Sequence, residues 1–328
     1  MPKTYLITGG AGFIGAHLAE KLLMEGHRVL ALDDLSTGQY SNVEHLKACP
    51  TFELTVDTIM NRPVLATLVD RADYIFHLAA VVGVKRVLES PVRTIEINVR
   101  ATDSILDLAN VKSKPILVTS TSEVYGKSAK QPLNEEGDLA IGSTARPRWS
   151  YATSKALDEC LAIAYYREKG LPVVVVRLFN TVGPRQSARY GMVLPRFVEQ
   201  ALAGKPLTVY GDGNQSRCFG FVGDVVWALS KLVENPSAYG KIYNVGSQEE
   251  VTMTELAQRV KQRLGSNSAI VYIPYAEAYD ADYEDTPQRV PDTTRLRELI
   301  GFEAKTKLNE IIDRIADAYR SSQFRATA

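Results

Sequence analysis

Short apolar stretches alternate with stretches of helical spacing through the first half of the chain. The apolar stretches predict β-strands at Tyr5–Thr8, Arg28–Leu32, Thr51–Val56, Tyr74–Leu78, Ile116–Thr119 and Val173–Leu178. Helices are predicted around Ile14, Leu18, Leu22 and Leu23, and at Val64–Val69, Thr94–Ala109 and Tyr151–Glu168. Strands that alternate with helices predict βαβ units and a parallel sheet, with strands covered on both faces.

The alternation breaks after about residue 180, where glycine and proline become frequent. Helices are predicted at Leu194–Ala203, Val222–Glu234 and Thr254–Leu264, with short strands between them and an amphipathic helix at Leu308–Tyr319. We therefore expect an α/β protein with a doubly wound parallel sheet in residues 1–180 and a smaller C-terminal α/β domain in residues 181–328. Segments such as 215–245 are candidates to return to the first domain.

The composition narrows the class of protein. The chain has 328 residues, 45% of them hydrophobic, and its 38 Lys and Arg balance 38 Asp and Glu. Zero net charge argues against a nucleic-acid polymer as partner, and no apolar run approaches the ~18–20 residues of a membrane span. The scattered Cys49, Cys160 and Cys218 suggest neither disulfides nor a metal site. Because Met1 leads directly into a strand-like segment, we expect a cytoplasmic protein.

A glycine-rich segment follows the first predicted strand and opens the first predicted helix. Its glycines Gly9, Gly12 and Gly15 are spaced three apart. Such glycines allow a tight turn, an approach of backbone N–H groups to a pyrophosphate, and close packing of the helix on the sheet. Asp33 ends the second predicted strand, where a carboxylate accepts hydrogen bonds from an adenosine ribose and repels a 2′-phosphate. The segment predicts dinucleotide binding, with NAD preferred to NADP.

Tyr151 and Lys155 lie four residues apart, so they share one face of a predicted helix. We expect the Lys155 ammonium to lower the pKa of the Tyr151 phenol and to hold the nicotinamide ribose. A tyrosinate beside the cofactor can take a proton from a sugar hydroxyl while hydride leaves the same carbon.

Together these segments resemble the extended branch of the short-chain dehydrogenase/reductase superfamily, and the similarity extends from Thr8 to Asp292. The resemblance implies a Rossmann-type fold and makes Thr121 the hydroxyl partner of Tyr151. It implies cofactor contacts from Gly9, Gly12, Phe13, Ile14, Gly15, Asp33, Asp57, Leu78, Ala79, Ala80, Asn98, Tyr151 and Lys155.

Glu123 follows the fifth predicted strand and suggests chemistry at the sugar C5. A ketone at C4 labilises a carboxylate on C5, whereas an enzyme that only inverts C4 needs no carboxylate there. The stretch Ser120–Gly126 resembles UDP-glucuronate decarboxylases and GDP-mannose 4,6-dehydratases, which carry this Glu. The alternative is that Glu123 only caps the following turn.

Two further stretches resemble the decarboxylases, namely Arg146–Tyr151 and Tyr279–Asp285 with the following Arg289–Asp292. The resemblance implies that Arg289 faces a sugar carboxylate, which a guanidinium can bind through two hydrogen bonds. The loop Ala80–Val87 departs from the decarboxylases, because Val87 stands where they carry a Tyr that meets the substrate. This loop is closer to UDP-glucuronate and UDP-glucose 4-epimerases, with Lys85 or Arg86 as candidate carboxylate partners.

The second half of the chain resembles the nucleotide-sugar end of the family. Leu178–Arg185 is similar to the segment whose Asn contacts the diphosphate, and Leu207–Phe219 is similar to the uridine-and-phosphate segment. The substrate contacts that the resemblance implies are Lys85, Ser122, Asn180, Arg185, Tyr210, Arg217 and Arg289.

The sequence therefore predicts an NAD-dependent enzyme that works through a 4-keto nucleotide sugar. The favoured reaction is UDP-glucuronate decarboxylation, with Thr121, Glu123, Tyr151, Lys155 and Arg289 as catalytic residues. UDP-sugar 4-epimerisation, 4,6-dehydration and a catalytically dead nucleotide sensor remain alternatives. The resemblance also implies a homodimer in which the helices at Thr94–Ala109 and Tyr151–Glu168 pair with their copies.

Overall fold

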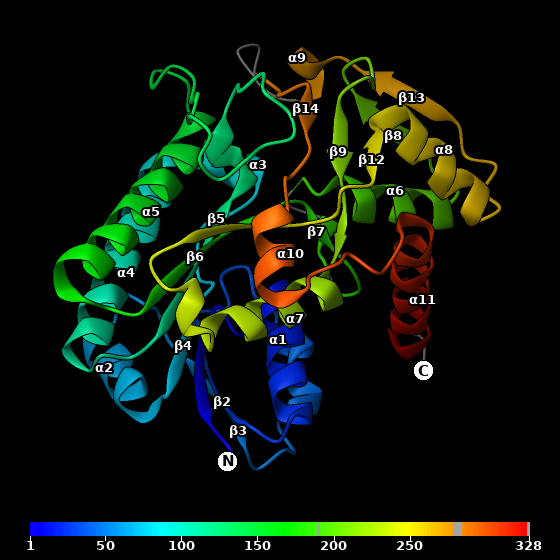
Figure 1. Cartoon of the computed structure of the whole chain (residues 1–328). Helices are drawn as coiled ribbons and strands as arrows, with labels where there is room; N and C mark the ends of the chain where they lie inside the picture. The colour runs from blue at the N-terminus through cyan, green and yellow to red at the C-terminus, as the bar shows by residue number, and fades with distance from the viewer. Residues whose placement is uncertain (189–190, 279–283, 327–328) are drawn as a thin grey trace.

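A seven-stranded parallel sheet forms the centre of the larger lobe in the computed structural model, which describes residues 1–188, 191–278 and 284–326 (Figure 1). The strand order is β11-β6-β5-β4-β1-β2-β3. The strands are β1 (Thr4–Thr8), β2 (Arg28–Asp33), β3 (Phe52–Val56), β4 (Tyr74–His77), β5 (Ile116–Thr121), β6 (Val173–Leu178) and β11 (Ile242–Val245). The order reverses between β1 and β4, which is where doubly wound sheets bind their ligands. The predicted fold class is confirmed.

Helices cover both faces of this sheet. One face carries α1 (Phe13–Met24), α7 (Val222–Val233) and α10 (Thr294–Ile300), and the other carries α2 (Arg62–Arg71), α4 (Pro91–Val111) and α5 (Trp149–Lys169) (Figure 1). The valines of β6 are fully buried because their side chains alternate between these two apolar cores. A short helix, α3 (Val84–Glu89), precedes α4.

A smaller lobe lies beside the C-terminal ends of the strands (Figure 1). Its apolar core joins α6 (Val193–Leu202), α8 (Met253–Arg263) and α11 (Leu308–Ala326). The short strands beyond β6 are β7 (Thr181–Val182), β8 (Leu207–Tyr210), β9 (Ser216–Cys218), β10 (Gly220–Phe221), β12 (Glu250–Thr252), β13 (Ile270–Ile273) and β14 (Gln288–Arg289). They form small sheets β10-β7, β12-β9-β14 and β13-β8, and a short helix, α9 (Tyr275–Ala278), follows β13.

The predicted strands of the first half agree with the structure to within two residues at each end. The predicted terminal helix is longer than expected and extends to Ala326. Three elements beyond residue 180 pack with the large sheet: α7 lies against α1, β11 pairs with β6, and α10 packs on β11 and α7. The domain boundary at residue 180 stays a prediction.

The length and polarity of the helices decide whether any of them could cross a membrane. None of the helices within the described ranges is both long and apolar enough to cross a membrane.

The parallel strands determine where the site lies, because their C-terminal ends meet at one edge of the sheet and bring the following loops together.

Candidate active site

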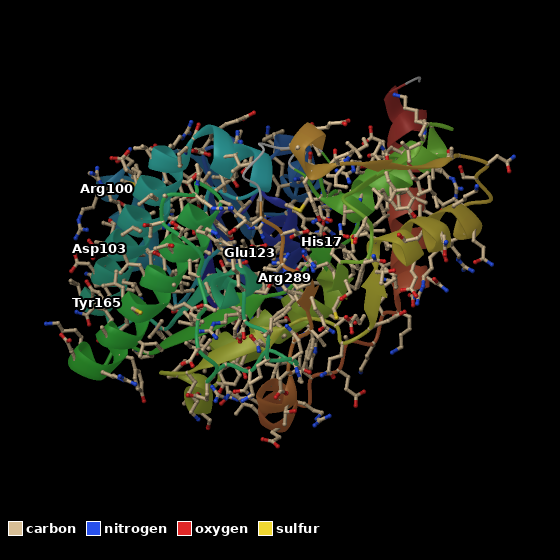
Figure 2. All side chains as sticks on the ribbon, turned by 90° about the horizontal axis from the view of Figure 1, so that it is seen from above. His17, Arg100, Asp103, Glu123, Tyr165 and Arg289 are labelled. Atoms are coloured by element: carbon tan, nitrogen blue, oxygen red, sulfur yellow. The ribbon has the colours of Figure 1, made fainter. Side chains whose placement is uncertain are left out.

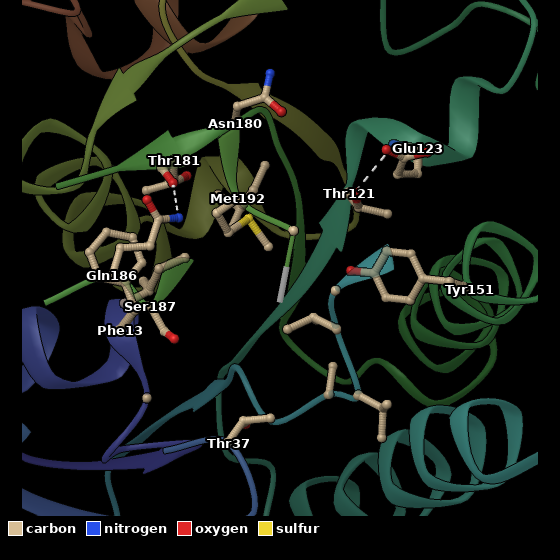
Figure 3. A pocket seen from close by; sticks show the side chains of 18 of the residues that line it. Phe13, Thr37, Thr121, Glu123, Tyr151, Asn180, Thr181, Gln186, Ser187 and Met192 are labelled. Carbon is tan, nitrogen blue, oxygen red and sulfur yellow. Dashed lines mark hydrogen bonds between the residues drawn. The ribbon is translucent and has the colours of Figure 1, made fainter. Parts of the chain in front are cut away.

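A cavity of about 520 Å³ opens at the C-terminal ends of the strands and is lined from both lobes (Figure 3). The predicted residues that line it are Gly9, Gly12, Phe13, Ile14, Gly15, Asp33, Asp57, Leu78, Ala79, Ala80, Thr121, Ser122, Glu123, Tyr151, Lys155, Asn180, Arg185, Tyr210, Arg217 and Arg289. The fold thus brings the glycine loop, the Tyr–Lys pair and the arginines of the second half to one space. The part each plays toward a ligand stays a prediction.

The glycine loop has the shape that its sequence predicts. Gly9 has φ +74°, and a Cβ on Gly15 would lie 2.1 Å from the Gly9 carbonyl oxygen. Gly12 directly precedes α1 and has no side chain that could cap the helix. The first N–H groups of α1 therefore remain available to an anion. These features fit the pyrophosphate of a dinucleotide.

Asp33 holds the glycine loop from the end of β2. Its carboxylate accepts hydrogen bonds from the backbone N–H groups of Ala11 at 2.9 Å and Leu35 at 2.8 Å. Burial raises the pKa of Asp33, and these hydrogen bonds lower it in part. A Cβ on Gly38 would lie 2.7 Å from the carboxylate, so a glycine there leaves the carboxylate room. The strand end that was predicted to meet a ribose therefore also organises the loop.

Asn98 lies behind the wall of the cavity and is not one of the described residues that line it. Its side chain accepts a hydrogen bond from the Val81 N–H at 2.8 Å and donates to the Ser154 hydroxyl at 3.1 Å. This bridge fixes the loop after β4 against α5. The predicted contact of Asn98 with a cofactor stays a prediction, and the structure shows a positioning contact instead.

Tyr151 lies on the first turn of α5, close to Thr121 at the end of β5 (Figure 3). Burial and the nearby Glu123 raise the pKa of Tyr151, and a hydrogen bond with Thr121 lowers it in part. The expectation that Lys155 lowers the pKa of Tyr151 stays a prediction. The Lys155 ammonium donates to the Asp158 carboxylate at 2.7 Å, so an opposite charge offsets its field.

Glu123 lies among arginines at the end of β5. It pairs with Arg289, and Arg148 donates to its other oxygen at 3.3 Å. Burial alone would raise the pKa of Glu123, but Arg289, Arg148 and Arg217 lower it to about 2. The carboxylate is therefore ionised at neutral pH.

Asp285 is a second carboxylate beside the same arginines. It accepts hydrogen bonds from Arg217 at 2.7 Å and from the Tyr275 hydroxyl at 2.8 Å, and Arg148 lies 3.6 Å away. Arg289 completes the group: its Nε is buried and has no hydrogen-bond partner in the described part of the chain. The three guanidinium groups of Arg148, Arg217 and Arg289, called the arginine cluster below, thus gather around the carboxylates of Glu123 and Asp285.

Several predicted substrate residues make contacts within the protein. Arg185, at φ 67°, holds both Glu20 oxygens at 2.6 and 2.8 Å. Asn180 donates to the Cys218 carbonyl at 3.1 Å, and the Arg196 guanidinium stacks 4.0 Å from the Tyr210 ring. These contacts order the cavity wall, and ligand binding by these residues stays a prediction.

Two predicted features fall partly outside the described structure. Lys85 lies in α3, but its side chain is outside the described part, and so are residues 279–283 of the decarboxylase-like stretch. The alternative partner Arg86 donates to the Ser36 carbonyl at 2.7 Å, beside the loop that follows β2.

The sequence analysis missed Arg148, Asp285 and Asp158 as site residues. Arg148 and Asp285 lie inside the quoted decarboxylase-like stretches, but their pairing joins residues far apart in the chain. Asp158 could have been noticed, because it lies three residues after Lys155 on one helix face. In the described residues, no group of His, Cys, Asp and Glu side chains could hold a metal ion.

Comparison with known proteins agrees with this geometry. A family model described as GDP-mannose 4,6 dehydratase matches residues 6–315. The chain belongs to this family. The match confirms the predicted kinship with the extended short-chain dehydrogenases/reductases.

Curated relatives cover most of the chain. A UDP-N-acetyl-alpha-D-glucosaminuronate decarboxylase from Bacillus cytotoxicus is 42% identical over 303 residues, which are 92% of this chain and 93% of the relative. UDP-glucuronic acid decarboxylase 1 from Danio rerio is 37% identical over 308 residues, 94% of this chain and 70% of the relative.

Solved structures share the fold. The UDP-glucose 4-epimerase of Thermotoga maritima with UDP-glucose superposes with a TM-score of 0.86 at 27% identity, covering 98% of this chain and 99% of that one. The dTDP-glucose 4,6-dehydratase of Bacillus anthracis in complex with NAD gives 0.86 at 26% identity, covering 98% of each chain.

The arginine cluster predicts how the cavity binds a small anion. Asp285→Asn removes a carboxylate that competes for Arg217, so inorganic pyrophosphate should bind roughly 5-fold more tightly, or about 1 kcal/mol. Isothermal titration calorimetry measures this affinity, and Asp212→Asn, an exposed loop substitution, is the matched control. Equal or weaker binding by Asp285→Asn would show that Asp285 does not compete with the anion.

Proposed function

We propose that the protein is an NAD-dependent decarboxylase of UDP-linked hexuronates that works through a 4-keto intermediate. The observation that carries the proposal is the ionised Glu123, paired with Arg289 and Arg148 beside Tyr151. An enzyme that only inverts C4 needs no carboxylate near C5, so Glu123 favours chemistry at C5. The names of the curated relatives support the same reaction class.

NAD is the proposed cofactor. The open N-terminus of α1, the crowded glycines and Asp33 would hold it, and solved relatives of the same fold carry NAD. When bound, NAD supplies the acceptor for a hydride from the sugar C4 and the donor that returns it. Among the residues of the chain, Tyr151 and Lys155 would face this step.

Tyr151 is proposed to take the proton of the C4 hydroxyl. Its raised pKa keeps the resting phenol protonated, and the Thr121 hydroxyl is the neighbouring hydrogen-bond partner that favours the phenolate. Lys155 can support the phenolate only when a ligand draws its ammonium from Asp158.

The cluster around Glu123 is proposed to act on the carboxylate. A C4 ketone is β to the C6 carboxylate, so the C5–C6 bond can break with release of CO2 while its electrons pass into the enolate of C4 and C5. The C5 carbon then takes a proton, and hydride returns to C4. Arg289 can hold the departing carboxylate with its unpartnered buried Nε. Glu123, being ionised, positions Arg289 and accepts hydrogen bonds.

UDP-sugar 4-epimerisation is the second candidate. Val87, which lines the cavity, stands where the decarboxylases carry a Tyr, and the loop before it resembles 4-epimerases. This reaction would use the same Tyr151 step and would leave the carboxylate in place.

Product analysis separates the candidates. Incubation with UDP-glucuronate or UDP-N-acetylglucosaminuronate should release CO2 and form the corresponding UDP-pentose, whereas UDP-glucose and GDP-mannose should remain unchanged. Nuclear magnetic resonance of the products checks this expectation. A galacto-configured product that keeps its carboxylate would contradict decarboxylation and establish the epimerase.

Glu123→Gln tests the carboxylate step separately. We expect it to lower decarboxylation by at least about 100-fold, the scale of a lost acid–base or positioning group. Tyr151→Phe should also abolish turnover but leave NAD binding intact, as fluorescence titration can measure. Full biological activity of Tyr151→Phe would favour the sensor, and full decarboxylation by Glu123→Gln would reduce Glu123 to a turn cap.

We also propose a homodimer through α4 and α5, as the family resemblance implies. These helices pack on each other and expose apolar side chains, with Val92 70%, Ile95 45% and Leu157 50% exposed. A second copy would remove this apolar surface from water.

Leu157→Glu tests the dimer. A buried charge at the centre of the interface should shift the mass in solution from two chains to one, measured by light scattering. Met24→Glu, at a position 81% exposed on α1, is the matched control and should leave the mass unchanged. A wild-type mass of one chain contradicts the proposal.

A cytoplasmic location is proposed as well. All three cysteines are free, which is common where thiols are kept reduced. Cell fractionation that recovers the protein outside the cytoplasm would contradict this location.

A further inference from the structure

Lys155 and Asp158 form an ion pair within the wall of the cavity. Both lie on α5, three residues apart, and their side chains are 2% and 0% exposed. The ammonium nitrogen lies 2.7 Å from the Asp158 carboxylate. A pair so deeply buried is shielded little by water, so its charges act strongly on neighbouring groups.

The side chains beside this ion pair determine how its charges act. Thr102 of α4 and Glu159 face Asp158, and Glu159 is itself neutralised by Arg177 at 2.7 Å. The buried imidazole of His77 feels Lys155; burial and this charge lower the pKa of His77 to about 3, so it is neutral.

Tyr151 lies on the same helix as the pair. Its charged neighbours are Glu123 from the end of β5 and Asp158 from α5, and both oppose ionisation of the phenol after burial itself. Lys155 donates to Asp158 and not to Tyr151. Burial, Glu123 and Asp158 therefore oppose ionisation of the phenol, although Glu123 is paired with Arg289 and Asp158 with Lys155.

We propose that Asp158 is a positioning residue that binds the Lys155 ammonium and offsets its charge beside Tyr151. The inference rests on the proposed use of Tyr151 as the proton acceptor. It adds that a third residue on the same helix sets how strongly Lys155 can favour the phenolate.

The sign of the effect follows from electrostatics. Asp158 places a negative charge near Tyr151, and this charge opposes ionisation of the phenol. A nearby negative charge raises the pKa of a phenol, so its removal must lower the pKa of Tyr151. Asp158→Asn keeps the shape of the side chain and removes only the charge.

The test is a titration of the tyrosinate absorbance of the protein without cofactor. The contribution of Tyr151 is isolated by subtracting the curve of Tyr151→Phe, measured in the wild-type and in the Asp158→Asn background. Asp158→Asn should move this contribution at least about one pH unit lower, a tenfold change in the ionisation constant. The acidic limb of the kcat/KM profile should move in the same direction. The titration needs no turnover, so its result is independent of the proposed reaction. The titration can contradict the role of Asp158 while the reaction is confirmed, and it can support that role while the reaction is contradicted.

Controls separate charge from structure. Asp103→Asn, on an exposed part of α4 away from Glu123 and Arg289, should leave the Tyr151 difference curve unchanged, because the nearby tyrosine that it affects is Tyr165 (Figure 2). Asp158→Glu keeps the charge and should restore most of the wild-type curve. Asp158→Ser, which leaves room for a water beside Lys155, is the second uncharged variant and should shift the curve as Asp158→Asn does.

Coincident wild-type and Asp158→Asn curves overturn the proposal. Loss of folding in both uncharged variants, with Asp103→Asn intact, also overturns it in favour of a purely structural ion pair.

Discussion

The ion pair between Glu123 and Arg289 joins residues 166 positions apart and connects the large sheet to the smaller lobe. Glu123 is brought there by the end of β5, and Arg289 by β14, which pairs with β9 beside Arg217. Two charges that leave water together need good geometry and further partners. Arg148 supplies one such partner, so one cluster of charges both joins the two lobes and lines the cavity.

The zero net charge of the whole chain does not reveal how its charged side chains are grouped in the cavity. The arginine cluster gathers three positive charges around Glu123 and Asp285 in a space where water screens little. Such a site suits one small ligand with several negative charges, as a nucleotide sugar with a carboxylate has. It gives no broad basic surface, which is what a nucleic-acid polymer would need.

The features that the sequence predicts well are local ones. The tight turn at Gly9 and the close packing at Gly15 follow from the spacing of the glycines, whereas the hydrogen bond of Asp33 to Ala11 appears only in the structure. The parallel sheet follows from the alternation of strands and helices. Arg148 and Asp285 were not predictable in this way, because their meeting depends on how two distant segments pack. Lys155 was assigned to Tyr151 because helical spacing shows which side chains share a face, but spacing alone cannot rank Asp158 against Tyr151 as its partner.

The fate of the sugar carboxylate tests the account most directly. UDP-glucuronate with an isotopically labelled carboxylate carbon, incubated with the enzyme in deuterated water, should yield labelled CO2 and UDP-pentose in equal amounts. Mass spectrometry and nuclear magnetic resonance should find one deuterium at C5 of that pentose, because the carbanion left by CO2 takes its proton from solvent or an exchangeable group. Retention of the label in a C4 epimer of the substrate would contradict the account.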